Sequence, residues 1–225
     1  MVVKISRVYL IIIPLLLLHL SPVFAQNNTD ALSTYRTGRD LESRNHINEA
    51  DFFYNAVIRI CNDEISRNTA TADTYTALTW TLQRQRKYAD VISWGERGLK
   101  LFENEYRLVE VMGEAYFYLE DHEQSLRYMQ RYTNSVPRGE RSSIAYFFIG
   151  EIYRVRKQYH HADIAYSTAL QLDPGVALWW YRLGLVREAA GDSAQAITAY
   201  EQAVRFNPNY REASESLTRL RTQAN

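Results

Sequence analysis

Small and apolar residues recur along this chain at helical spacing, and over residues 143–210 one arrangement occurs twice in succession. Each copy holds an aromatic residue, an aliphatic residue followed by glycine, two alanines that flank a tyrosine, and a closing proline. The first copy supplies Tyr146, Ile149, Gly150, Ala162, Tyr166, Ala169 and Pro174. The second supplies Trp180, Leu183, Gly184, Ala196, Tyr200, Ala203 and Pro208, each 34 residues further on. Spacings of three and four residues predict helices, and a repeat of this length predicts a pair of them.

The second copy indicates where its two helices begin and end. Residues 177–190 predict the first helix, and Gly191 predicts its end, because glycine readily adopts the left-handed conformation that closes many helices. Asp192 or Ser193 then caps the second helix. Pro208 ends it, since proline disfavours a helical conformation in the residue before it. The equivalent turns of two earlier copies are predicted at Lys157–Gln158 and Glu120–Asp121.

Weaker copies of the same arrangement fill most of the remaining chain. The five predicted repeats span residues 31–64, 72–105, 106–139, 143–176 and 177–210, and a further helix is predicted at 209–222. The copy at 72–105 departs furthest, because Thr79 stands where the others have glycine and Glu103 stands where they have proline. We expect five helix pairs followed by one final helix.

These residues, spacings and turns resemble the tetratricopeptide repeat. The resemblance implies an all-α fold, a right-handed α-solenoid of five tandem helix-turn-helix repeats plus a C-terminal capping helix. We expect Gly184 to face Ala196 where the two helices approach most closely, and Tyr200 to fill the gap to the next helix. Arg187 departs from the family pattern, which has an aromatic there, so the last repeat is expected to meet the final helix differently.

The first 25 residues have the pattern of a secretory signal peptide. Lys4 and Arg7 precede an apolar run at residues 8–20, and Ala25 ends a short segment suited to cleavage. An uncleaved membrane anchor is the alternative, but the run is shorter than the roughly 20 residues that span a bilayer. The sequence therefore predicts cleavage after residue 25, a short linker at 26–30 and export. The destination would be the periplasm in a didermal bacterium and the exterior in other cells.

Charge and cysteine content narrow the classes of partner. The chain has 26 basic and 26 acidic residues, and loss of the leader leaves 24 against 26. A nucleic-acid-binding surface usually needs a basic excess, so no nucleic-acid partner is expected. Cys61 is the only cysteine, which excludes an internal disulfide, and its apolar neighbours predict a buried side chain.

The predicted mature chain lacks the sequence patterns of an active site. It has no nucleophile elbow, phosphate-binding loop, zinc spacing or dinucleotide fingerprint. His160, His161 and Asp163 come nearest to a metal cluster, but adjacent helical residues point about 100° apart, and a solvated helix start is the simpler interpretation. We expect no catalytic residue, no metal and no cofactor, and therefore no enzyme.

The resemblance also implies where a partner would bind. In this family the first helices line a concave surface that usually holds a peptide or a partner helix. The aromatic residues predicted there are Tyr35, Trp80, Phe117, Tyr118, Phe147, Phe148 and Tyr181. The charged ones are Arg36, Arg39, Glu110, Glu114, Glu151, Arg154 and Arg182. Aromatic and arginine anchors are typical of protein-binding hot spots, although core packing or self-association is an alternative role for the aromatics.

Two functions follow as hypotheses. The first is a non-enzymatic scaffold or adaptor in the cell envelope, which binds a peptide or a partner protein in the concave groove and belongs to an envelope complex. The alternative is a periplasmic, transporter-associated subunit that sequesters an apolar small ligand or lipid. Relatives that bind chaperones grip a C-terminal carboxylate with a lysine and asparagine clamp, but Tyr35 and Arg39 occupy the corresponding positions here. That specific function is not predicted.

Overall fold

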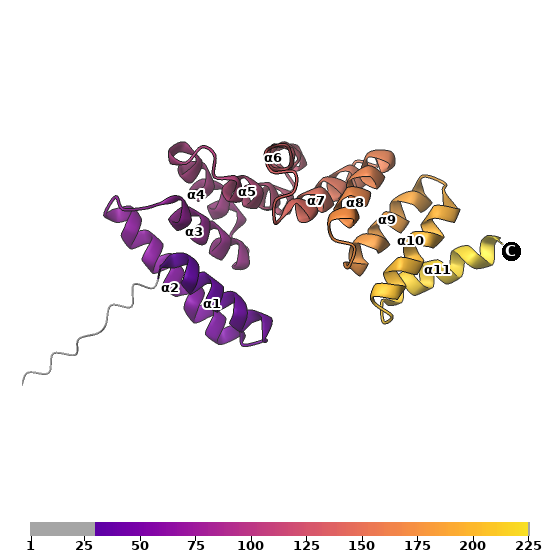
Figure 1. The fold of residues 1–225 in the computed structure, drawn as a ribbon, viewed down its shortest axis with the longest axis horizontal. Coiled ribbons are helices and arrows are strands. Elements are labelled where there is room, and N and C mark those ends of the chain that lie inside the picture. Colours follow the sequence, from indigo (N-terminus) through magenta and orange to yellow (C-terminus); the bar gives the residue numbers. More distant parts are fainter. Residues whose placement is uncertain (1–29, 225) are drawn as a thin grey trace, which may run out of the picture.

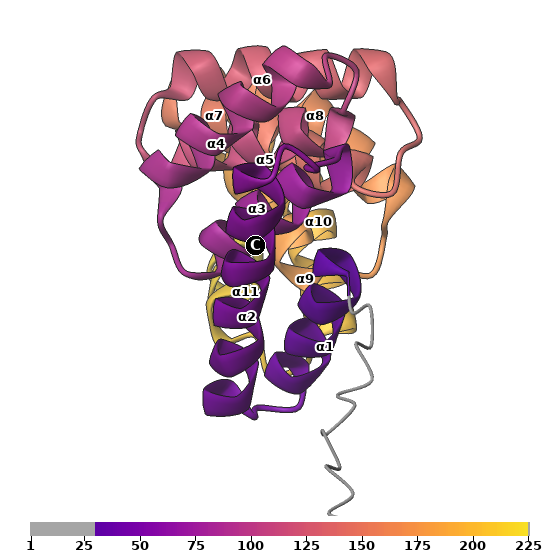
Figure 2. The ribbon, with the colours of Figure 1, turned by 90° about the vertical axis from the view of Figure 1, so that its left-hand side faces the viewer.

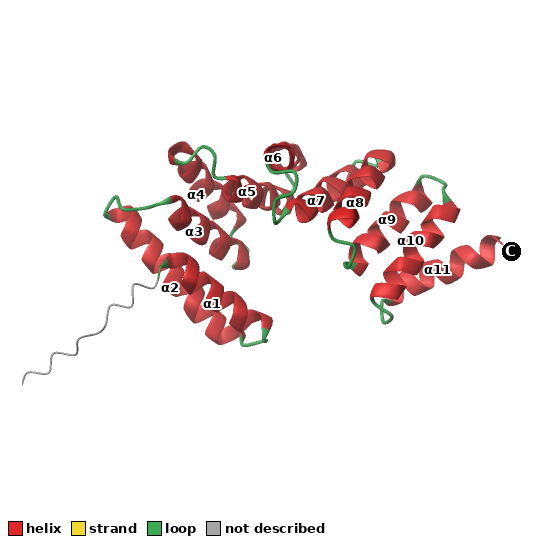
Figure 3. Cartoon of the chain, in the orientation of Figure 1, coloured by secondary structure: helices red, strands yellow, loops and turns green. Residues whose placement is uncertain are grey.

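The computed structural model describes residues 30–224, and that part of the chain consists of eleven α-helices with no strand (Figure 3). The predicted signal peptide, residues 1–25, and the first four residues of the predicted linker lie outside this range. The helices are α1 (Ala31–Ser43), α2 (Ile47–Ser66), α3 (Ala72–Arg84), α4 (Tyr88–Leu101), α5 (Tyr106–Tyr118), α6 (His122–Ser135), α7 (Ser142–Val155), α8 (Tyr159–Leu172), α9 (Ala177–Ala189), α10 (Ser193–Phe206) and α11 (Arg211–Ala224).

The helices form an arched array that follows the order of the chain (Figure 1). Helices α1 and α2 form one foot of the arch, α5, α6 and α7 its crown, and α10 and α11 the other foot. Each helix packs against the next, and α1, α3, α5 and α7 also pack against one another in succession. Figure 2, viewed along the array, shows the two feet lying below the crown. This confirms the predicted all-α repeat fold.

Each first helix ends in the same tight turn. One residue of the turn has a positive φ: Asn45, Arg86, Glu120, Lys157 or Gly191, with φ of 65°, 57°, 63°, 58° and 86° in that order. The next backbone N–H donates to a carbonyl five residues back, as from Asp192 to Arg187 at 2.9 Å. This is the Schellman closure of a helix. Asp192 also accepts from the N–H of Gln195 at 3.0 Å, so it caps α10, as one of the two predicted alternatives had it.

In the first, fourth and fifth repeats, a tyrosine of the second helix lies against the glycine of the first helix. A Cβ added to Gly150 would lie 2.6 Å from two carbons of the Tyr166 ring, too close for a real contact. Gly184 stands in the same relation to Tyr200. The three atoms nearest to a Cβ added at Gly184 all belong to Tyr200, and the expected contact between Gly184 and Ala196 stays a prediction. The first, fourth and fifth repeats thus close around a buried tyrosine ring, and Met129 takes its place in the third.

The second repeat reverses this pairing, which explains its weak pattern. Thr79 replaces the glycine of the first helix and is fully buried, while Gly95 replaces the large residue of the second. Met112, from the next repeat, fills the space: its Cγ would lie 2.6 Å from a Cβ added to Gly95. A small and a large residue therefore also meet at this point of the second repeat, but the large residue, Met112, belongs to α5.

The last repeat contacts the repeat before it and the final helix through different residues. Arg187 does not reach α11; its guanidinium pairs with Asp163 of α8 at 2.9 Å and 3.2 Å. The helix α11 docks instead through Leu217 and Leu220, which join Tyr200 in one core cluster. Ala213 is also buried, and most of the rest of α11 carries charged, hydroxyl and amide side chains.

Candidate functional site

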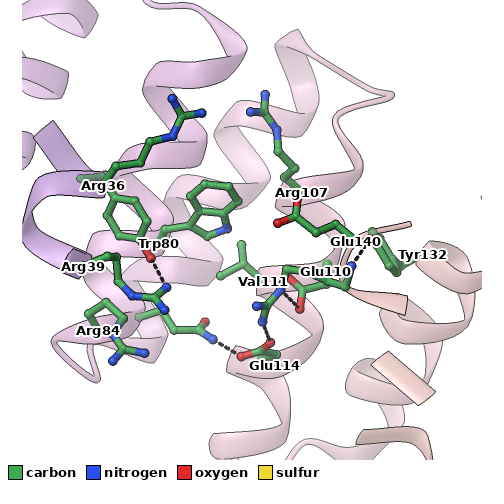
Figure 4. A pocket seen from close by; sticks show the side chains of 13 residues that line it. Arg36, Arg39, Trp80, Arg84, Arg107, Glu110, Val111, Glu114, Tyr132 and Glu140 are labelled. Atoms are coloured by element: carbon green, nitrogen blue, oxygen red, sulfur yellow. Dashed lines mark hydrogen bonds and ion pairs between the residues drawn. The ribbon is translucent and has the colours of Figure 1, made fainter. Parts of the chain in front are cut away.

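A hollow of about 440 Å³ opens between the first helices of repeats one to three (Figure 4). Helices α1, α3 and α5 contribute most of its wall, and α6 and the loop before α7 close one side. The lining residues are Tyr35, Arg36, Arg39, Trp80, Gln83, Arg84, Arg107, Glu110, Val111, Glu114, Tyr132, Glu140 and Arg141. The hollow therefore combines aromatic rings with five arginines and three glutamates.

Trp80 lies at the centre of this hollow and is only half-buried. The Tyr35 ring lies 5.4 Å from it, centroid to centroid, and the guanidinium of Arg107 lies 6.0 Å from its ring centroid. Tyr35 is itself buried, and its hydroxyl accepts a hydrogen bond from Arg39 at 3.2 Å. The indole is thus held in place by its neighbours while one part of it stays accessible.

Two glutamates form the floor of the hollow and share one arginine. Nε of Arg141 donates to Glu110 at 2.8 Å, and the same guanidinium also pairs with Glu114, which accepts a second hydrogen bond from Gln83 (Figure 4). The side chains of Glu110 and Glu114 are 2% and 7% exposed, against 36% for Arg141. Their oxygen atoms therefore face protein donors rather than a ligand.

The shared arginine leaves this floor with more carboxyl groups than cations. Burial raises the pKa of Glu110 well above its ordinary value, and the charge of Glu114 raises it further. Arg141 opposes both effects without cancelling them. Two buried carboxylates beside a single cation favour retention of one proton, so Glu110 is the group that stays protonated to higher pH.

A third glutamate lies just behind the arginines of α1 and α3. Glu42 accepts from Arg84 at 2.5 Å and from the hydroxyl of Tyr54 at 2.7 Å. Burial alone would raise its pKa, but these two hydrogen bonds and the nearby charges of Arg84 and Arg39 hold that pKa below its ordinary value. Glu42 therefore stays ionised and fixes Arg84 at the wall of the hollow.

The predicted site residues divide between this hollow and the rest of the array. Those that line the hollow are Tyr35, Arg36, Arg39, Trp80 and Glu114, together with Glu110. The other predicted residues, Phe117, Tyr118, Phe147, Phe148, Glu151, Arg154, Tyr181 and Arg182, lie further along the array. The structure does not bring all fourteen into one site.

A strip of aromatic side chains continues from the hollow along α5, α7 and α9. Tyr118, which is 49% exposed, stacks on Tyr88 at 4.7 Å and lies 6.0 Å from Phe148. Phe148 is only 7% exposed, and it contacts Phe117 at 5.1 Å and Phe147 at 5.8 Å. Tyr118 is thus the most accessible member, whereas Phe148 contributes mainly to the core.

The aromatics of the last two repeats serve the packing between helices. Phe147 stacks on Trp179 at 5.4 Å with an interplanar angle of 17°, and Trp179 is buried. Tyr181 lies between Tyr200 at 5.8 Å and Tyr210 at 5.0 Å. These residues support the alternative role of core packing that the sequence left open.

The predicted charges of the same repeats pair with one another. Glu151 is 6% exposed and pairs with Arg154 at 2.8 Å and Arg182 at 3.1 Å. Its other role is to accept the hydroxyl hydrogen bond of Tyr166 at 2.5 Å. Burial is the largest cause that raises the pKa of that tyrosine, followed by the charge of Glu151. This network ties α7, α8 and α9 together.

The sequence interpretation missed part of the lining. The lining residues that it did not select are Gln83, Arg84, Arg107, Val111, Tyr132, Glu140 and Arg141. Arg84 lies four positions after Trp80 on one helix, so its place on the same face was available from the spacing. Glu140 and Arg141 lie in the three-residue insertion before the fourth repeat, and a break in the period marks such a loop.

Metal and membrane sites have no support in the described residues. No group of three or more histidine, cysteine, aspartate or glutamate side chains between residues 30 and 224 is arranged to hold a metal ion. Asp163, beside His160 and His161, pairs with Arg187. None of the helices in this range combines the length and hydropathy that crossing a bilayer requires.

Comparison with known families identifies two of the repeats directly. Residues 177–210 match one tetratricopeptide-repeat family model and residues 144–175 match another. No curated protein sequence matches the chain significantly. Together with the helical repeat fold, these matches define the class. The chain is a tetratricopeptide-repeat protein, and repeats of this class generally serve as protein-interaction modules rather than as catalysts.

Solved structures share the fold at low sequence identity. YrrB, described as a tetratricopeptide-repeat protein with an unusual peptide-binding site, has a TM-score of 0.57 at 19% identity, over 85% of this chain and 94% of its own. MamA has a TM-score of 0.63 at 16% identity, over 78% and 96%. The Cut9–Hcn1 hetero-tetramer gives 0.61 at 17%, over 87% of this chain and 44% of the matched one. At these identities the likeness concerns the fold alone.

Proposed function

We propose that this protein is a non-enzymatic interaction scaffold that holds a peptide, or an extended segment of a partner protein, in the hollow between α1, α3 and α5. The observation that carries the proposal is the accessible indole of Trp80, fixed between Tyr35 and Arg107 inside a concave wall. An aromatic ring and arginines left partly open on a rigid surface are typical of binding hot spots. In a closed core the same indole would be covered.

A peptide suits this hollow better than an apolar small ligand does. Arg36 and Arg39 line it with N–H donors that make no close pair with a carboxylate of residues 30–224, and an apolar ligand would cover these donors without giving them partners. The volume of about 440 Å³ and the open rim fit a few side chains of a longer chain. The neighbour YrrB, which shares the fold, carries a peptide-binding site of its own, and this supports the same use here.

The proposed location is the cell envelope, with the protein exported through its leader. Lys4, Arg7 and the apolar run at 8–20 support this part of the proposal. The compartment would be the periplasm in a didermal bacterium. The scaffold would there hold a member of an envelope complex.

Site-specific photo-crosslinking tests the proposal in the native cell. A photoreactive residue replaces Glu140 at the rim of the hollow, and a matched variant carries it at Ile164, a 68% exposed position on α8. We expect a discrete crosslinked protein from position 140 alone, and its loss when Trp80→Ala is added. Equal crosslinking from both positions, or crosslinking that survives Trp80→Ala, would contradict the proposal.

A further inference from the structure

We infer that the segment bound in the hollow is acidic, with carboxylate side chains paired to Arg36 and Arg39 while an adjoining part of the segment lies against Trp80. This inference rests on the proposed function and names the chemistry of the partner. The carboxylates meant here are those of side chains within an extended segment, not the carboxylate at the end of a chain.

The charges around the hollow are arranged in layers. Three carboxylates lie beneath the surface on the side of α1, α3 and α5: the side chains of Glu42, Glu110 and Glu114 are 26%, 2% and 7% exposed, whereas Glu140 is exposed on the opposite rim. The guanidinium groups lie above them, and Arg39 and Arg84 are 48% and 38% exposed. An approaching chain therefore meets cations first, although the summed charge of the region is small.

Arg36 and Arg39 retain donors that no carboxylate of the structure uses. Arg36 is exposed and makes no ion pair or hydrogen bond within residues 30–224. Arg39 donates to the hydroxyl of Tyr35, and the nearest carboxylate oxygen, on Glu42, is 3.8 Å away from its Nε. A guanidinium group has five N–H donors in a planar fork that matches a carboxylate. Arg36 can thus bind an incoming carboxylate without breaking an internal pair, and Arg39 can do so at the expense of no more than its 3.8 Å contact with Glu42.

The remaining arginines are held by the protein itself. Arg107 pairs with Glu105 and Asp73, each at 2.7 Å, and Arg141 bridges the two buried glutamates. Glu140 lies with Arg107 and Tyr132, across the hollow from Arg39 and Arg84 (Figure 4). The surface formed by Arg36, Arg39 and Trp80 is therefore the part of the hollow that favours acidic residues.

Three synthetic peptides of equal length test the inference. Each is a fluorescein-labelled twelve-residue chain with one tryptophan, and four of its positions are all glutamate, all glutamine or all lysine. Fluorescence anisotropy with the full mature chain gives their dissociation constants. We expect the glutamate peptide to bind at least about tenfold more tightly than the glutamine peptide, because two charge-assisted hydrogen-bonded pairs are available. High salt should reduce this difference.

Arginine variants locate the effect. The double variant Arg36→Gln/Arg39→Gln should bind the glutamate and glutamine peptides equally, while Arg211→Gln, a control on the exposed face of α11, should keep the full preference. Equal binding of the two peptides by the unmodified protein would overturn the inference, and so would the absence of binding by the glutamate peptide. If crosslinking at position 140 still captured a partner, the proposed function would survive that result; if it captured none, both would fail.

Discussion

The hydroxyl of Tyr200 donates to the carboxylate of Glu188 across 2.8 Å, and this one bond joins the two helices of the last repeat. Arg219 of α11 then binds the same carboxylate through both terminal nitrogens, at 2.6 Å and 2.9 Å. Burial raises the pKa of the tyrosine, and the hydrogen bond from Arg219 is the largest cause that lowers the pKa of the glutamate. A helix pair is thereby linked to its successor through a single carboxylate.

The same relay occurs at two other places in the array. Tyr54 donates to Glu42, which binds Arg84 of the next first helix. Tyr166 donates to Glu151, which pairs with Arg182 of the next first helix. Since each repeat contacts only its neighbours, such links add directional contacts to the apolar packing between repeats.

Removal of the Tyr200 hydroxyl should weaken the last repeat. Tyr200→Phe keeps the ring over Gly184 but leaves Glu188 without one of its donors, and we expect a loss of about 1–2 kcal/mol in the free energy of unfolding. Urea denaturation measures it. The control is Tyr181→Phe, since the Tyr181 hydroxyl donates no hydrogen bond within residues 30–224 and its removal should change stability little.

The contact between glycine and tyrosine should not tolerate a methyl group. Gly150→Ala places a Cβ against the buried ring of Tyr166, and we expect destabilisation by about 1–3 kcal/mol through overpacking. Gly175→Ala is the matched control, because its nearest neighbour, Oδ1 of Asp173, would lie 3.6 Å from the new Cβ. Equal stability of the two variants would contradict the assignment of the glycine to a steric role.

The turns between paired helices offer a test in the opposite direction. Lys157 adopts a φ of 58°, a conformation that costs a side-chain-bearing residue about 1–2 kcal/mol. Lys157→Gly should therefore stabilise the protein by roughly 0.5–1 kcal/mol after the greater backbone entropy of glycine is subtracted. Gly191→Ala, at a φ of 86°, should destabilise it by about 1 kcal/mol. Thermal melting of both variants tests this, with a higher melting temperature expected for Lys157→Gly and a lower one for Gly191→Ala.

The free energy of unfolding should fall as pH rises from about 4.5 toward neutral, because Glu110 at the floor of the hollow loses its proton. The folded-state pKa of Glu110 is raised, so its contribution is fully present below the unfolded value and is lost as pH rises through the folded one. The charged groups that face it are Glu114 and Arg141, with Tyr132 nearby. Glu110→Gln keeps a hydrogen-bonding group of the same shape but cannot ionise.

We therefore expect Glu110→Gln to gain stability relative to the unmodified protein between pH 5 and pH 8. Urea denaturation at these two pH values gives the difference directly. Glu42 and Glu188 have lowered pKa values, so their contribution to the stability of the folded protein is lost as pH falls. Their effect on stability therefore lies below this pH window. A stability difference that does not change with pH would show that Glu110 does not titrate as described.

The sequence predicted the repeats because their signals are local. The glycine, the alanines and the closing proline each act within one helix pair, so their spacing in the sequence is enough to predict where they lie. The partner of each side chain across repeats is not local. Arg187 was noted only as a departure from the family pattern, and the structure pairs it with Asp163 of α8, in the repeat before it. A fixed period places a residue on a face but does not select which neighbour reaches it.

The candidate site was predictable on the same terms. Tyr35, Arg36, Arg39 and Trp80 share a face of the first helices, and they line the hollow. Glu114 lines the floor of the hollow, where it pairs with Arg141 and its side chain is only 7% exposed. Glu151, Arg154 and Arg182 occupy comparable helical positions, yet the two arginines pair with the buried carboxylate of Glu151. Whether a charged side chain stays accessible or is paired internally depends on residues of the next repeat. The pattern of one repeat therefore does not predict it.

The central claim is that Trp80 anchors a partner in the hollow, and a binding measurement on that side chain tests it most directly. The partner captured by crosslinking is titrated into the unmodified protein, Trp80→Ala and the control Phe52→Ala, whose side chain is 63% exposed on α2. Unfolding is measured beside each titration, so that binding is compared between folded proteins. We predict a loss of about 2 kcal/mol or more in binding free energy for Trp80→Ala alone. Equal affinity of the folded Trp80→Ala protein and the unmodified protein would contradict the account.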